Sequence, residues 1–405
     1  PTIPVIDIHC HPALKMYLFA GRIEREHRPG SDGLIGNVTD MHVDLPSLAK
    51  GNVCGVVSVL HLPERGIIDY TGNILFKLVL TANAGKIEAK RKGEAPFRQT
   101  MDMMDLIEDR IDRVRDDGHE VLIARSAVEF EARFLAGKTT FIHSIEGAHS
   151  LGTGTQHELL QRLDRFIDRG LAQFTIAHFF ENEITGSGGG IPPHMKEEMK
   201  YHGPGPSLGG LNQLDGKGEA LVMRMLERGV VLDLTHCTVK ARQEIYAINK
   251  NMGAPGKPKR PLVFSHTGLR NLVDPGMDAN DQLCLPDEAE VKEVNATGGV
   301  IGIIFMNYWL NGIEEDDPHR FDGAIDLVVQ TALELKRIAG NCKHIAIGTD
   351  LDGFSQTPDD LTTEAAMPKL FAALHAAGFS DDELMDIGHR NYLRVLRNAW
   401  GPIAA

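Results

Sequence analysis

Six short apolar segments of this 405-residue chain end in a histidine or an acidic residue. The residues at these ends are His9 with His11, Glu146, His178, His236, His266 and Asp350. Imidazoles and carboxylates without thiolates suit zinc, with manganese, iron or cobalt as further candidates. Four histidines and a glutamate exceed what one catalytic zinc needs, so the pattern favours two ions that share a bridging carboxylate.

Each of these residues alone has an ordinary structural explanation. A single histidine after a strand is usually a hydrogen-bonded structural residue, and a single acid there is often a helix N-cap. Burying several imidazoles and two carboxylates in an apolar barrel mouth is costly unless metal or partners compensate. The joint pattern therefore favours a metal centre over coincidence.

The segments that carry these residues have the composition of buried strands. Near-continuous apolar runs of this length suit strands that are covered on both faces, as in a parallel sheet. The strand candidates are 3–10, 55–62, 139–146, 171–178, 230–236, 261–267, 299–306 and 344–350.

Helical patterns alternate with the strand candidates. Those over 157–169, 219–228 and 324–339 each end close to a glycine, and Ser380 and Glu383 have the spacing of a capping box. This rhythm predicts a (β/α)8 barrel, with a doubly wound open sheet as the structural alternative. In a barrel the carboxyl ends of the strands meet at one face, where residues as far apart as 9 and 350 would converge.

Two segments interrupt the βα rhythm. Residues 63–138 are mostly polar with a helical pattern, which indicates a helical insertion whose most charged part is 86–115. Residues 186–218 are rich in glycine and proline and are expected to form a long loop after the fourth strand. The glycine run lacks the lysine and hydroxyl residue of a phosphate loop, so a flexible lid is favoured over a phosphate site.

The composition is that of a globular protein, with 42% hydrophobic and 24% charged residues. The formal net charge of −14 argues against nucleic acid and anionic membrane surfaces as partners. No apolar run reaches the roughly 18 residues that a membrane-spanning helix needs. Five cysteines without a CxxC pair, and no visible leader, lead us to expect a reducing, cytoplasmic location.

The segments IDIHCHP, HSIEGAHSLG, TIAHFFENE, VVLDLTHCT, PLVFSHTG and IAIGTDLDGF follow in this order. Together they resemble the renal (membrane) dipeptidase family, a branch of the amidohydrolase superfamily. The resemblance covers nearly the whole chain, up to GHRNYLRVL near residue 396. It implies a single barrel domain over 1–405, two zinc ions per chain and hydrolysis of dipeptides, often with a D-residue at the C-terminal position.

The resemblance also implies which residues bind metal. His9 resembles the first-strand zinc ligand, and Glu146 resembles the carboxylate that bridges the two ions. His236 and His266 resemble the ligands of the second zinc. The family usually has an aspartate where this chain has His11; an imidazole can still bind zinc, and the change makes the site more positive by one unit.

Three further roles concern the substrate. His178 resembles the histidine that contacts substrate and stabilises the oxyanion, and Asp350 resembles the acid–base residue that passes a proton to the leaving amine. The family arginine that binds the substrate carboxylate has no counterpart in DQLCLPDE. Arg270 is the candidate substitute, although a solvated surface arginine is the simpler interpretation. Tyr308 follows the seventh strand and is expected to line the substrate pocket or to pack.

Other residues near these positions have weaker claims. Cys10 and Cys237 alternate away from the ligand side and are expected to be packed small groups. His143 has the opposite parity to Glu146 and is expected to be structural. His149 is expected behind the ligands or in a loop, and Asp352 is the second candidate for the acid–base group.

We therefore expect a metal-dependent hydrolase of a dipeptide or related small amide, in which metal-activated water attacks the carbonyl carbon. One alternative is a sibling enzyme acting on another acylated amine, a lactone or a cyclic amide. Another is a binding or scaffold protein that keeps metal for structure, against which the presence of Asp350 and His178 argues. The resemblance also suggests a homodimer, although the sequence shows no interface signal.

Overall fold

The computed structural model describes residues 3–27, 29, 40–74, 93–211, 215–252, 259–312, 323–353 and 357–401. Its main sheet runs in the order β2-β1-β11-β10-β9-β8-β5-β4-β3, and β4 also pairs with β2. This last pairing closes eight parallel strands into a barrel, so the (β/α)8 prediction is confirmed and the open sheet is excluded. The barrel strands are β1 (Val5–Cys10), β2 (Val53–Leu60), β4 (Thr139–Glu146), β5 (Leu171–Thr175), β8 (Val231–Asp233), β9 (Leu262–Thr267), β10 (Val300–Ile303) and β11 (Ile345–Ile347).

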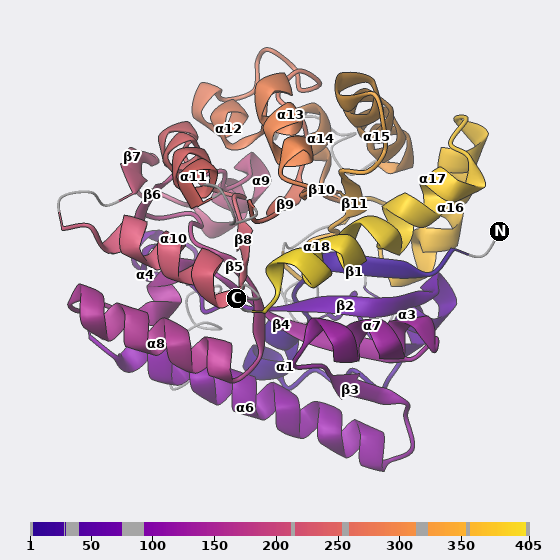
Figure 1. Cartoon of the computed structure of the whole chain (residues 1–405), viewed down its shortest axis with the longest axis horizontal. Helices are drawn as coiled ribbons and strands as arrows, with labels where there is room; N and C mark the ends of the chain where they lie inside the picture. The colour runs from indigo at the N-terminus through magenta and orange to yellow at the C-terminus, as the bar shows by residue number, and fades with distance from the viewer. Residues whose placement is uncertain are drawn as a thin grey trace.

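Helices surround the barrel in chain order (Figure 1). The longer ones are α1 (Pro12–Phe19), α6 (Ala95–Asp116), α7 (Ala127–Leu135), α8 (Gln156–Asp168), α10 (Lys217–Arg228), α11 (Val239–Met252), α13 (Glu288–Ala296), α15 (Ile325–Ala339), α16 (Met367–Ala376) and α18 (Asn391–Ala399). The shorter ones are α3 (Leu45–Gly51), α4 (Arg65–Tyr70), α9 (Pro193–Met199), α12 (Ala279–Cys284), α14 (Asn307–Asn311), α17 (Asp381–Met385), the 3₁₀ turns η1 (Ala148–Leu151) and η2 (Glu364–Ala366), and the π-turn η3 (Asp386–Arg390). No helix among the described residues is long and apolar enough to span a membrane.

The barrel interior is filled by small and branched side chains, one or two from each strand. They include Ile6, Ile8, Val57, Ile142, Ala172, Val231, Val263, Val300 and Ala346, and all are buried. Helix α18 closes the end of the barrel opposite the site, where Tyr392 donates a hydrogen bond to Gln173 inside the barrel (Figure 1). The apolar core therefore fills the barrel on the side of α18, and polar residues occupy the carboxyl ends of the strands.

Local signals in the sequence explain where several helices begin and end. Ser380 and Glu383 form the predicted capping box at the start of α17. Helices α10 and α15 end at Gly229 and Gly340, whose φ angles of 79° and 71° are left-handed and suit glycine. The predicted helices over 157–169, 219–228 and 324–339 correspond to α8, α10 and α15 within two residues.

The two interrupting segments contain more structure than their composition indicates. Within 63–138 the structure has α4, α6 and α7, as expected, and also β3 (Val121–Ile123), which pairs with the first half of β4. Residues 75–92, including part of the charged stretch 86–115, lie outside the described residues. Within 186–218, β6 (Thr185–Ser187) and β7 (Ser207–Leu211) form an antiparallel pair around α9, so the long-loop prediction is wrong for this part. Residues 212–214 also lie outside the description.

Candidate metal centre

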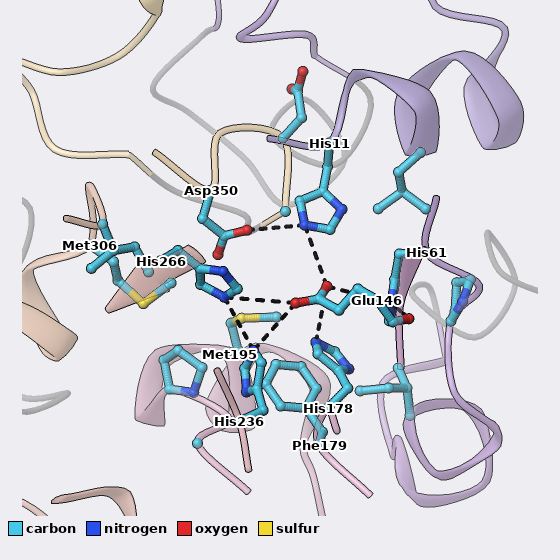
Figure 2. Close-up of a pocket in the computed structure, with 18 of the residues that line it drawn as sticks. His11, His61, Glu146, His178, Phe179, Met195, His236, His266, Met306 and Asp350 are labelled. Atoms are coloured by element: carbon cyan, nitrogen blue, oxygen red, sulfur yellow. Dashed lines mark hydrogen bonds and ion pairs between the residues drawn. The ribbon is translucent and has the colours of Figure 1, made fainter. Parts of the chain in front are cut away.

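The predicted ligands converge at the carboxyl ends of the barrel strands. His9 belongs to β1, Glu146 is the last residue of β4 and His266 belongs to β9. His11 is the N-cap of α1, directly after β1. His178, His236 and Asp350 follow β5, β8 and β11, and all seven side chains lie in one cluster, part of which Figure 2 shows. Closure of the barrel thus gathers residues 341 positions apart, as the sequence predicts.

Glu146 lies at the centre of the cluster and is 2% exposed. Its Oε1 is 3.5 Å from His9 Nε2, 3.5 Å from His236 Nε2 and 3.7 Å from His266 Nε2. Its Oε2 is 3.5 Å from His11 Nε2. A single buried carboxylate therefore faces four histidines from three other strands or strand ends, which is the placement expected of a bridging group.

Asp350 lies beside the first-strand histidines. Its Oδ1 is 3.1 Å from His11 Nε2 and 3.7 Å from His9 Nε2, and the two Nε2 atoms are 3.1 Å apart. The Asp350 side chain is 13% exposed, against 0% for His9. Asp350 is therefore the acid of the cluster that is accessible from the cavity.

A serine behind the cluster fixes the orientation of two ligands. Ser265 is fully buried and donates its hydroxyl proton to Asp233 Oδ2 at 2.5 Å. Its oxygen is 2.8 Å from His9 Nδ1 and 2.9 Å from His266 Nδ1, so both imidazoles donate their Nδ1 proton to it. Their Nε2 atoms then carry the lone pairs that face Glu146, which is the tautomer a metal ion requires.

Two residues of the cluster, His61 and Glu64, were not predicted from the sequence. His61 Nδ1 lies 3.6 Å from Glu146 Oε2, and its ring centroid is 4.4 Å from that of His178. Glu64 accepts a 2.6 Å hydrogen bond from His178 Nδ1, which turns His178 Nε2 toward Glu146 Oε2 at 3.7 Å. The signal for His61 was present, because it is the next-to-last residue of the strand candidate 55–62. Glu64 follows Pro63 outside any strand pattern, and only the fold brings it to His178.

Burial governs the charge of the cluster. It lowers the pKa of His9, His178 and His266 well below the ordinary histidine value, and neighbouring histidines lower the pKa of each further. Burial also raises the pKa of Glu146 well above the usual carboxyl range. Burial alone would lower the pKa of His11, but its hydrogen bond to Asp350 and the charge of Glu146 raise it. Most imidazoles are thus neutral and able to donate lone pairs.

The backbone is strained at two of these residues. His236 and Asp350 have φ angles of 63° and 60°, in the left-handed region that non-glycine residues rarely adopt. Asp352, with φ of 69°, shares this feature, and its carboxylate accepts hydrogen bonds from the backbone N–H groups of His42 and Val43. Strained conformations of this kind concentrate at functional sites. The contacts of Asp352 assign it to holding a neighbouring loop.

The cluster fits metal ions by its donor set and its unsatisfied atoms. Glu146 Oε1 is buried and accepts no hydrogen bond from any described residue. His236 Nε2 and His266 Nε2 lie only 3.2 Å apart, with the His266 lone pair directed into the gap. Neutral imidazoles and carboxylates are ligands that zinc and similar ions accept. A cation between these atoms would satisfy lone pairs that otherwise face one another.

The cluster forms the floor of a cavity of about 1060 Å³, its open mouth included. The upper wall is apolar and comes from the helices and loops that follow the strands. Its apolar residues include Leu14, Leu18, Phe19, Ile67, Phe179, Met195, Met306 and Trp309. Lys15 is the only lysine or arginine among the described residues that line this cavity, and it is 4% exposed.

Two residues predicted to bind substrate do not line the cavity. The Arg270 guanidinium donates to the carbonyls of Gln282 and Leu285 and lies 3.3 Å from Asp287, so it stabilises the loop after β9. The Tyr308 hydroxyl donates a 2.6 Å hydrogen bond to Asp281 and is buried behind the wall. Met306 and Trp309 from the same segment face the cavity instead.

Cys10, Cys237, His143 and His149, which the sequence placed near the ligands, lie outside the cavity. Cys10 and Cys237 are buried and do not line the cavity. His143 is 3.2 Å from Glu108, on the outer side of β4. His149 lies behind His61, and its Nε2 is 2.7 Å from the carbonyl of Leu62. Within the described part of the chain, none of these four side chains belongs to a possible metal-binding group with Glu146.

Sequence comparisons relate the chain to proteins described as dipeptidases. The model of the family described as membrane dipeptidase (peptidase family M19) matches residues 1–400. An uncharacterized dipeptidase of Schizosaccharomyces pombe is 26% identical over 262 residues, which are 65% of this chain and only 54% of that protein. Dipeptidase verJ of Clonostachys rogersoniana is 24% identical over 362 residues, which are 89% of this chain and 76% of that protein.

Solved structures with the same architecture include two of bacterial proteins. A metallopeptidase of Rhodobacter sphaeroides, liganded with a phosphinate mimic of the dipeptide L-Ala-D-Ala, has a TM-score of 0.71 and 18% identity, and the match covers 99% of this chain and 100% of that one. The probable dipeptidase PvdM of Pseudomonas aeruginosa has a TM-score of 0.68 and 16% identity, with 98% and 95% covered. At such identities the likeness shows a shared barrel fold. Because the family model matches nearly the entire sequence, this chain belongs to the membrane dipeptidase family.

Proposed function

We propose that this protein is a binuclear zinc enzyme that hydrolyses dipeptides, including dipeptides with a C-terminal D-residue. The observation that carries the proposal is the buried Glu146 carboxylate, which is surrounded by imidazoles and has one oxygen without a hydrogen bond from any described residue. Family membership supports the reaction class. The ligand of the Rhodobacter sphaeroides structure, a mimic of L-Ala-D-Ala, supports the stereochemical detail by analogy.

The ions would be held by Glu146 and the histidines around it, and when bound they would polarise a carbonyl and increase the acidity of water. Asp350 accepts the proton of the attacking water and delivers it to the leaving nitrogen. Two features suit it to this role: its exposure to the cavity, and a pKa that burial would raise but that His266 and His11 lower. It is therefore a carboxylate, ready to accept, before the reaction begins.

The cavity wall indicates which substrates suit the site. Lys15 follows His11 by four residues, so both side chains lie on the cavity side of α1, together with Leu14 and Leu18. A lysine ammonium has three donors and can add a carboxylate to the contacts it already makes. We therefore propose that Lys15 binds the substrate carboxylate and that the apolar wall accepts apolar side chains.

One observation favours a second candidate function. Arg270 does not line the cavity, and the wall above the metal centre is largely apolar. A hydrolase of another acylated amine, a lactone or a cyclic amide would need no anchor for a carboxylate. The two candidates differ in whether a free carboxylate on the substrate increases kcat/KM.

The proposal is tested with a substrate panel and a chelator. L,L- and L,D-dipeptides with alanine, leucine or phenylalanine are compared with their C-terminal amides and with simple lactones. We expect hydrolysis of the dipeptides, loss of activity after chelation and recovery with Zn²⁺. Activity that survives complete removal of metal would refute the metal-dependent mechanism, and preference for the amides or lactones would favour the second candidate.

A further inference from the structure

Glu64 is a buried carboxylate that serves a distant part of the chain. It is 4% exposed and is the N-cap of α4, yet its side chain makes no capping hydrogen bond with that helix. Both of its oxygens instead accept hydrogen bonds from the segment after β5, 114 to 116 positions along the chain. Burying an ionised group costs free energy unless its contacts compensate, so the partners of Glu64 indicate its role.

Three donors of one short segment converge on this carboxylate. Its Oε2 accepts from His178 Nδ1 at 2.6 Å and from the backbone N–H of Phe179 at 3.2 Å, and its Oε1 accepts from the backbone N–H of Phe180 at 3.0 Å. Within the described part of the chain it pairs with no lysine or arginine, and its ion-pair contacts are with His178 and, at 3.9 Å, with His149. The carboxylate therefore holds the His178 segment rather than balancing a fixed cation.

The start of α4 and the segment after β5 are also fitted to each other by packing. A Cβ atom on Gly66 would lie 2.4 Å from two ring carbons of Phe180, which leaves room for glycine alone. On the other side, the hydroxyl of Ser187 in β6 donates to the carbonyl of His178. The backbone of His178 and its ring are thus held by different partners.

The ring of His178 has packing neighbours, but Glu64 is the contact that distinguishes its two nitrogens. The ring centroids of Phe179 and His61 lie 3.9 and 4.4 Å from that of His178, and such contacts restrict the ring without selecting one nitrogen. Glu64 accepts the Nδ1 proton and so directs Nε2 to the cavity floor, 3.7 Å from Glu146 Oε2 (Figure 2).

We propose that Glu64 is a positioning residue for the reaction: it orients His178 so that Nε2 contacts the reacting group of the bound substrate. Glu64 does not line the cavity and acts only through His178. The inference rests on the proposed function and deepens it, because a positioned His178 matters only if a substrate is cleaved beside Glu146.

The location of Nε2 determines which kinetic constant depends on Glu64. Nε2 lies beside the central carboxylate of the cluster, whereas Lys15, the proposed contact for the end of the substrate, comes from α1. Losing the orientation of His178 should therefore lower kcat more than it raises KM. A displacement of about 1 Å at a reacting group costs up to about 100-fold in rate.

Steady-state kinetics of the zinc-loaded protein test the coupling between the two residues. Glu64→Ala should lower kcat by up to about 100-fold. Glu64→Gln should lose less, because its amide oxygen can still accept the Nδ1 proton. In a His178→Phe background, which keeps a ring but has no ring nitrogen, adding E64A should change kcat by less than about threefold, since the group through which Glu64 acts is gone.

Asp360→Ala is the matched control. Asp360 likewise accepts two backbone N–H groups, those of Ala324 and Ile325, and lies outside the cavity. D360A should keep its kcat within about threefold of wild type. A kcat of E64A close to that of wild type, or an equal loss from E64A in the wild-type and H178F backgrounds, would overturn the proposal, because a purely structural contact acts on both backgrounds alike.

Proton NMR of the same proteins tests the hydrogen bond without substrate. Wild type should show a slowly exchanging, low-field imidazole N–H resonance, assigned to His178 by its absence from H178F. E64A should lose this resonance, and D360A should keep it. A resonance that is unchanged in E64A would show that Glu64 does not hold the ring, and would overturn the proposal however the variants fold.

Failure of the inference is separable from failure of the proposed function. If wild type hydrolyses dipeptides while E64A keeps its kcat and its resonance, only the positioning role fails. If wild type cleaves no member of the substrate panel, the proposed function fails and the inference fails with it.

Discussion

Replacing Ser265 by alanine tests whether one hydroxyl group orients two of the histidines around Glu146. Ser265 accepts hydrogen bonds from His9 and His266, and its own proton goes to Asp233. Without the hydroxyl, both imidazoles lose the partner that fixes their tautomer and ring orientation. Asp233 keeps donors from Thr175 and Thr235, so the substitution leaves no unpaired buried charge.

The magnitude follows from the two lost contacts. Removing a partner behind one ligand typically weakens metal binding by roughly 10–100-fold, which corresponds to about 1.4–2.7 kcal/mol. Because two imidazoles lose their partner, we expect the upper end of this range, a weakening of metal binding by about 100-fold.

Competition with a fluorescent zinc chelator measures the zinc affinity of the stripped protein. Ser144→Ala is the matched control, because Ser144 is also buried in a barrel strand but its hydroxyl bonds to no described residue. The S144A protein should bind both ions like wild type. A zinc affinity of S265A within threefold of wild type would refute the orienting role.

Three further predictions concern single residues outside the ligand set. Asp350→Asn should keep both ions but lower kcat by roughly 10²–10⁴-fold in a steady-state assay, because asparagine tolerates the left-handed backbone yet cannot take the proton; near-normal kcat would place the proton elsewhere. Lys15→Met should raise KM for dipeptides by roughly 10–100-fold with little change for their amides, whereas exposed Lys50→Met should change neither. Burial alone would raise the pKa of Glu108, but its contacts with His143 and Arg169 lower it to about 2. The ionised Glu108 therefore stabilises the fold above about pH 4.5, by up to roughly 3 kcal/mol, and this stabilisation is lost as pH falls toward 2. In denaturant titrations, the free energy of unfolding of Glu108→Gln should be lower than that of wild type at pH 7 and equal to it near pH 2.

Sequence patterns predicted the barrel because its strands are buried on both faces and read as short apolar runs. The helices α8, α10 and α15 were equally visible, since each has an apolar stripe and a glycine near its end. β3 was not, because three residues on the outer side of the barrel carry too little pattern. The β6–β7 pair was hidden by its glycines, which give no alternation of apolar and polar side chains.

Some residues of the site could likewise be predicted from the sequence, and others could not. Residues at strand ends, such as His9 and Glu146, could be predicted because parallel strands must deliver their carboxyl ends to one face. Arg270 could not be placed from the sequence, since the loop after β9 turns its guanidinium toward the carbonyls near α12. Glu64 could not be found either, because its role depends on a 2.6 Å contact with a residue 114 positions away.

The strain at His236 and Asp350 links these observations to energetics. A left-handed backbone at a non-glycine residue costs of order 1–3 kcal/mol, and here it occurs beside a buried carboxylate that lacks hydrogen bonds from described residues. Neither feature stabilises the fold by itself, and imidazole lone pairs that face one another add to the cost. Bound metal ions would satisfy the carboxylate and the imidazole lone pairs, and they would hold the strained residues in place. Apolar side chains fill the rest of the barrel, and α18 closes its far end. This packing stabilises the fold, so the carboxyl ends of the strands can carry polar residues that bind rather than pack.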